Sequence, residues 1–129
     1  MSIGELAKAT AVKIVTIRYC EHVGLMPAPA RTEGNYRSYG AEHSHRLQFI
    51  KRLRELGFTL DEVRDLLRLS SEKSRPCDQV DRITNSHLAT VEKKLQDLTK
   101  LAAELRALSN RCKGGGRIGE CRIIEALTP

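Results

Sequence analysis

The 129-residue sequence has no apolar run approaching the ~20 residues that span a membrane, and no apolar segment typical of a signal peptide near its N-terminus. We therefore expect a cytoplasmic protein with no membrane partner. Thiols stay reduced in the cytoplasm, so the four cysteines are expected to bind metal or sense redox state rather than form structural disulfides. No nucleophile, base and orienting group occur at usable spacing, so we do not expect an enzyme.

Proline and glycine are absent between Pro76 and Gly114. From Asp78 to Arg111, apolar residues recur with the three- and four-residue spacing of a coiled-coil helix. They are Leu88, Val91, Leu95, Leu98, Ala102 and Leu105. A chain this short cannot bury the apolar face of so long a helix in its own core, so the pattern predicts self-association.

Cysteines lie at both ends of this helix. Cys77 and Cys112 are separated by a helix on the order of 50 Å long, so they cannot meet within one chain. If two copies pair antiparallel, Cys77 of one chain reaches Cys112 and Cys121 of the other, and two-fold symmetry forms the site twice. The spacing therefore predicts a three-thiol metal site at a homodimer interface.

The N-terminal part of the chain is basic. Residues 1–54 hold nine Lys or Arg against four Glu, so most of the net charge of +6 lies there, as expected of a surface that meets polyanions. Ser2 and Glu5 have the pattern of a capping box, and a second helix, roughly residues 13–22, follows a turn at 9–12. This pair suggests a helix-turn-helix, although an ordinary helical hairpin also fits. The recognition helix would carry Lys13, Thr16, Arg18 and Tyr19.

The segment after these helices is extended, because Pro27 and Pro29 disfavour helix. Glu33, Gly34 and Asn35 then form a predicted hairpin turn between short strands, which together resemble a wing. Its candidate phosphate contacts are Arg31, Tyr36 and Arg37, whereas Tyr39 is expected to pack against the helices. A solvated hairpin with incidental arginines is the alternative.

Two further helices complete the N-terminal part. The first, about residues 41–56, is expected to turn Leu47, Ile50, Leu53 and Leu56 inward, and the second begins at a capping box formed by Thr59 and Glu62. The sequence thus predicts a mainly α protein in three parts. If the helix pair and the hairpin are a helix-turn-helix with its wing, these parts are a winged helix-turn-helix DNA-binding domain (1–70), a linker and antiparallel coiled-coil dimerisation helix (71–111), and a metal-binding loop with a short C-terminal helix (112–129).

Five motifs, in order, resemble the MerR family of bacterial transcription regulators along essentially the whole chain. They are Ile3-Gly-Glu-Leu-Ala, Thr16-Ile-Arg-Tyr with Glu21 and Gly24-Leu25, Gly34-Asn-Tyr-Arg-x-Tyr39, Arg46-Leu-x-Phe-Ile50 and Leu56-Gly-Phe-x-Leu-x-Glu62. In addition, Cys77, Cys112 and Cys121 coincide with the ligand cysteines of the family's mercury-sensing branch and with ligands shared by its zinc, cadmium and lead branches.

The resemblance implies a homodimer that binds double-stranded promoter DNA with an overlong spacer. The metal-free form would repress, and metal binding would bend and undertwist the DNA so that RNA polymerase can engage both promoter elements. The positions matching the family's DNA contacts are Lys13, Thr16, Arg18, Tyr19, Arg31, Tyr36 and Arg37. Cys20 departs from the family, which usually has a tyrosine there, and is expected to be a small buried residue.

Three thiolates form a soft donor set that suits Hg(II), Pb(II), Cd(II), or Zn(II) with a fourth ligand. The loop between Cys112 and Cys121 lacks His and further Cys, which the family's zinc branch typically has, so three-thiolate binding of Hg(II) or Pb(II) fits best. His87 is the candidate fourth ligand, although a packing role is more common for such a residue. The alternatives are a zinc-responsive regulator, a regulator sensing oxidation of Cys112 and Cys121, and a metal-buffering protein.

Overall fold

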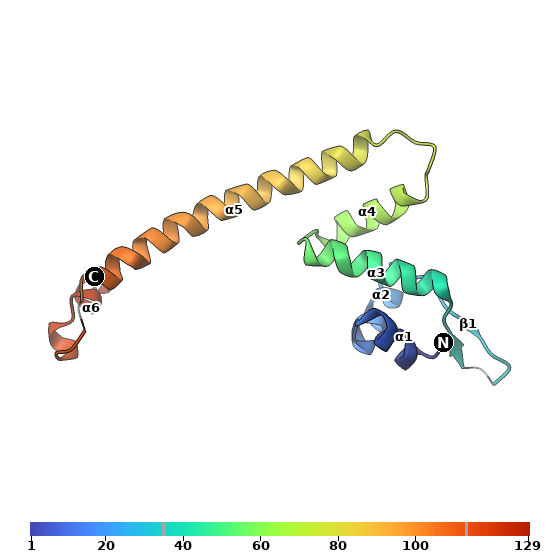
Figure 1. Cartoon of the computed structure of the whole chain (residues 1–129), viewed down its shortest axis with the longest axis horizontal. Coiled ribbons are helices and arrows are strands. Elements are labelled where there is room, and N and C mark those ends of the chain that lie inside the picture. Colours follow the sequence, from blue (N-terminus) through green and yellow to red (C-terminus); the bar gives the residue numbers. More distant parts are fainter. Residues whose placement is uncertain (35, 113) are drawn as a thin grey trace. The chain divides into compact units, whose positions relative to one another are not determined.

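The computed structural model describes residues 1–34, 36–112 and 114–129, and it divides into two compact units, Met1–Val80 and Asp81–Pro129. Figure 1 shows the elements along the chain. The fold is mainly helical, as predicted, with one small two-stranded sheet.

The first unit begins with two short helices, α1 (Ile3–Thr10) and α2 (Ile14–His22). The predicted capping box opens α1: the Glu5 N–H donates to Ser2 Oγ, and the Ser2 N–H donates to Glu5 Oε1, both at 3.2 Å. The turn is shorter than predicted, because α1 continues through Thr10, whose hydroxyl donates to the Leu6 carbonyl at 2.8 Å. A single left-handed residue, Ala11, with φ 55°, then ends the helix.

The wing follows as strands β1 (Ala30–Arg31) and β2 (Arg37–Ser38), which pair antiparallel. The register sets Ala30 opposite Ser38 and Arg31 opposite Arg37. The loop is closed by the Thr32 N–H, which donates to the Tyr36 carbonyl at 2.8 Å. The predicted turn residue Asn35 lies outside the described residues.

Helices α3 (Ala41–Glu55) and α4 (Leu60–Ser70) complete the core, in which α1 packs against α2 and α3, and α3 packs against α4. Leu47, Ile50 and Leu53 are buried as predicted, but the expectation for Leu56 is wrong: it is 47% exposed. The reason is that α3 ends at Glu55 and the chain reverses at Gly57, whose φ of +86° favours glycine. The Thr59 and Glu62 capping box opens α4 as predicted.

A single long helix, α5 (Asp78–Asn110), follows the polar segment after α4. All of α5 is described, and none of its residues is buried. The apolar stripe predicted from the sequence is exposed along it, at Leu88, Val91, Leu95, Leu98 and Leu105. The chain ends with a 3-10 turn, η1 (Ile118–Glu120), and helix α6 (Arg122–Leu127).

Candidate nucleic-acid interface and thiol centre

Helix α2 has one buried side and one exposed side. Ile17 and Cys20 are buried, which fixes the rotation of the helix on the core. The predicted recognition residues are consequently turned outward, and all four are exposed: Lys13, Thr16, Arg18 and Tyr19. Cys20 is a small buried residue, as expected, and burial raises the pKa of its thiol.

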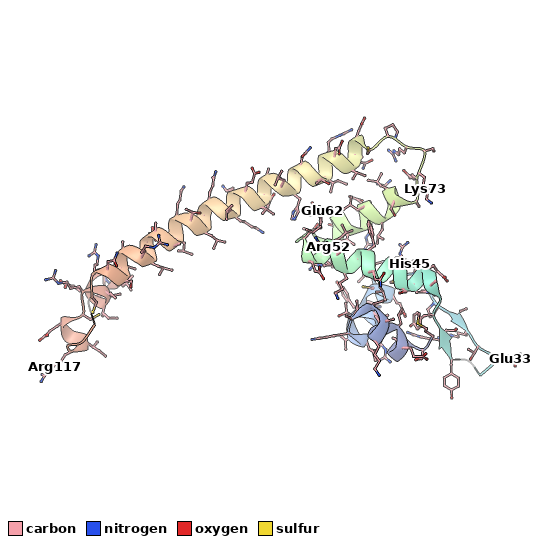
Figure 2. All side chains as sticks on the ribbon, in the orientation of Figure 1. Glu33, His45, Arg52, Glu62, Lys73 and Arg117 are labelled. Carbon is pink, nitrogen blue, oxygen red and sulfur yellow. The ribbon has the colours of Figure 1, made fainter. Side chains whose placement is uncertain are left out.

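The wing presents three further residues predicted to meet DNA. Arg31, Tyr36 and Arg37 are all exposed, Tyr36 to 76%. Tyr39 is 2% exposed, which confirms that it packs against the helices. The hairpin thus presents cationic and phenolic side chains outward, and Tyr39, directly after β2, anchors its end in the core. Glu33 lies near the tip of the hairpin (Figure 2).

Glu21 of α2 joins the recognition helix to the wing. Its carboxylate accepts a hydrogen bond from Arg37 Nη1 at 2.8 Å and another from the Tyr39 hydroxyl at 2.5 Å. The Arg37 pKa is raised by the hydrogen bond with Tyr39 and by the negative charge of Glu21. The Tyr39 pKa is raised by burial and then by its bond to Glu21. Both shifts favour a protonated donor facing a charged acceptor.

A surface cavity of about 450 Å³ lies where α2, the extended segment and the wing meet. It is lined by Arg18, Glu21, His22, Ala28, Pro29, Arg31 and Arg37. Three guanidinium groups around an open cavity form a site suited to a phosphate group. Sequence reasoning assigned Glu21 no role beyond its place in a motif. One signal for such a role is present, since Glu21 is the only carboxylate between Lys13 and Arg31.

The predicted metal ligands belong to different units of one chain. Cys77 is exposed and precedes α5, in the first unit, while Cys112 and Cys121 are half-buried and belong to the second. Within the described part of a single chain, no group of three His, Cys, Asp or Glu side chains is arranged to hold a metal ion. His87, the candidate fourth ligand, is half-buried in α5.

Cys112 and Cys121 interact with each other through their side chains. The Cys121 pKa is lowered, first by the backbone N–H groups of Ile124 and Ile123, with a smaller contribution from Cys112. These amides belong to the first turn of α6, which begins directly after Cys121. Arg117 points away from α6 in Figure 2. Two adjacent thiols, one of them favouring thiolate, fit a soft metal ion.

None of the helices in the described ranges is long and apolar enough to cross a membrane.

Two family models match the chain, "MerR HTH family regulatory protein" over residues 1–70 and "MerR, DNA binding" over residues 44–108. The chain therefore belongs to the MerR family of DNA-binding transcription regulators, which are not enzymes, as the sequence motifs indicated.

Three similar proteins are named for metals. The chain is 42% identical over 125 residues to the mercuric resistance operon regulatory protein of Bacillus cereus, covering 97% of this chain and 95% of that one. It matches the crystal structure of PbrR691 from Ralstonia metallidurans CH34 in complex with lead(II), with 40% identity, 99% coverage of both chains and a TM-score of 0.87. It also matches MerR from Bacillus megaterium MB1 in complex with mercury(II), with 36% identity, 98% coverage of both chains and a TM-score of 0.70. These relatives support a metal-responsive regulator of this family.

Proposed function

We propose that this chain forms a homodimer that represses a metal-resistance promoter when metal-free and activates it when a thiophilic divalent ion binds. The observation that carries the proposal is the distribution of the thiols: a pair at Cys112 and Cys121, and a third, Cys77, at the opposite end of a 33-residue helix.

The DNA-binding part of the proposal rests on the exposed basic surface of the first unit. Helix α2 would enter the major groove, and the wing would contact the adjacent backbone. The proposed contacts are Lys13, Thr16, Arg18, Tyr19, Arg31, Tyr36 and Arg37. Contacts to phosphate position the protein on the DNA but do not read the base sequence. Part of the sequence preference would therefore come from how readily the promoter deforms.

The dimer is supported by the exposed apolar stripe of α5. Leu88, Leu95 and Leu98 each leave at least half of their surface exposed, and a helix stripe of this spacing is stable in water when a second helix covers it. The antiparallel arrangement is proposed because a continuous 33-residue helix is about 50 Å long, so only reversal of the partner brings its Cys77 to Cys112 and Cys121.

The proposed metal ligands are Cys112 and Cys121 of one protomer with the partner's Cys77. Bound there, the ion would supply a soft Lewis-acid centre that links the two protomers. The thiol pair would hold the ion on the second unit, and the partner's Cys77, directly before α5, would connect it to the DNA-binding unit. Closing this link would favour the dimer arrangement that bends and undertwists the promoter for RNA polymerase.

Mercury(II), lead(II) and cadmium(II) suit three thiolates best. The relatives described above, named for mercury and lead, support the first two. Zinc(II) remains an alternative that would require a fourth ligand, for which His87 is the candidate.

The test is transcription from the cognate promoter titrated with Hg(II), Pb(II), Cd(II) and Zn(II) under reducing conditions. We expect repression without metal and activation by at least one of the first three ions. Activation that survives strict chelation and requires an oxidant would instead support a regulator that senses thiol oxidation, an alternative favoured by the contact between Cys112 and Cys121.

A further inference from the structure

Glu21 is an acidic residue on the surface proposed to meet DNA. The cavity that it lines also holds Arg18, Arg31 and Arg37, and a carboxylate there weakens attraction for phosphate. Its side chain is 12% exposed and accepts two hydrogen bonds, from Arg37 at the start of β2 and from the buried Tyr39 just after that strand.

We infer that Glu21 is a positioning residue that fixes the wing at a set angle to the recognition helix and thereby determines sequence specificity rather than affinity for DNA. The inference rests on the proposed DNA-binding surface. The two hydrogen bonds that Glu21 accepts connect the last turn of α2 to the wing. The sheet of the wing itself pairs two residues in each strand. A hairpin this short has little stability alone, so external bonds decide its orientation.

Arg37 thereby gains a second role. Its side chain is 41% exposed, so it can face a phosphate while its Nη1 donates to Glu21. A contact to phosphate strengthens binding to every sequence alike, whereas a fixed wing angle matters only where the DNA shape fits it. The two roles are therefore separated by comparing specific with nonspecific binding.

The experiment compares Glu21→Gln with Glu33→Gln. Both changes remove one negative charge from this surface and keep the side-chain shape, but Glu33 lies exposed near the wing tip, away from α2 (Figure 2). Binding is measured by fluorescence anisotropy on a duplex selected from a random pool by the unaltered protein, and on a scrambled duplex of equal length at the same salt concentration.

We expect Glu21→Gln to lower the ratio of specific to nonspecific affinity by about tenfold, the effect of losing one charged hydrogen bond. Glu33→Gln should leave the ratio unchanged. Equal ratios for the two variants would overturn the inference, since Glu21 would then act only through its charge. A parallel loss of both affinities with a lower melting temperature would also overturn it, because that outcome indicates a general folding role.

A double variant tests the link to Arg37. If the two residues act together, Glu21→Gln with Arg37→Gln lowers the ratio no further than either single change, while multiplied losses contradict the link. Should Glu21→Gln fail to fold, Tyr39→Phe keeps the buried ring and removes only the hydroxyl donor, and an unchanged ratio in that variant overturns the inference. If the unaltered protein enriches no sequence from the pool, the proposed function itself fails, which is a distinct outcome.

Discussion

Cys112 and Cys121 interact through their side chains within the second unit, whereas Cys77 belongs to the first unit, at the other end of α5. Two of the three proposed ligands are thus brought together by the folding of one chain. In the proposed arrangement the third ligand comes from a partner, so the dimer would be part of the site and the roles of the individual cysteines can be tested separately.

Replacing Cys77 by serine should abolish metal-induced transcription and leave operator binding nearly unchanged. The side chain is exposed and lies outside α2 and the wing, so its loss removes a proposed ligand without disturbing the DNA-binding surface. In vitro transcription and anisotropy on the same promoter measure the two effects. The matched control is Ser74→Ala in the same exposed segment, which should induce normally. Loss of operator binding in Cys77→Ser would show that this residue is structural.

Mixed dimers test whether the site is shared between protomers. A chain carrying Cys77→Ser, paired with a chain carrying Cys112→Ser and Cys121→Ser, retains one complete set of three thiols if each site takes Cys77 from the partner. Metal binding to differently tagged, co-purified heterodimers should therefore occur at one site per dimer, while each parent homodimer has none intact. Failure of the heterodimer to regain a site would contradict the shared arrangement.

Leu98→Asp should convert the protein to a monomer. The change places a charge in the middle of the exposed apolar stripe. Pairing with a second helix would then remove this charge from water, which is unfavourable. Sedimentation equilibrium measures the effect. Gln96→Asp introduces the same charge away from the stripe and should remain dimeric, so an unchanged association state in both variants would exclude α5 as the interface.

Stability should fall in alkaline solution because of Cys20. Burial raises its pKa, so the unfolded chain releases the thiol proton at a lower pH than the folded chain. The stability that the protonated Cys20 thiol contributes to the fold is fully present below the ordinary cysteine pKa of about 9 and is lost as the pH rises above that value. Urea unfolding between pH 7 and 10.5 measures this loss. Cys20→Ala should show a smaller fall, with the remainder due to groups such as Tyr39, whose pKa is also raised; an identical fall would contradict the assignment.

The sequence alone determined the elements whose causes are local. The capping boxes at Ser2 and Thr59 and the uninterrupted periodicity of α5 each depend on residues a few positions apart, so pattern and backbone preference predict them. The sequence also names the candidate recognition residues, and the structure shows why they are exposed: Ile17 and Cys20 form the buried side of α2.

Only the tertiary structure decided the contacts between residues far apart in the chain. Glu21 meets Arg37 and Tyr39 because the extended segment folds the wing back on α2, and the Cys112 side chain comes close enough to Cys121 to lower the Cys121 pKa. Leu56 is exposed although its spacing continues the buried face, since the helix ends one residue earlier. Such contacts depend on loop paths and on packing, which a period along the sequence does not encode. The cysteine stretch from Cys77 to Cys121 combines both cases: helix length separates its ends, and chain folding pairs two of its thiols.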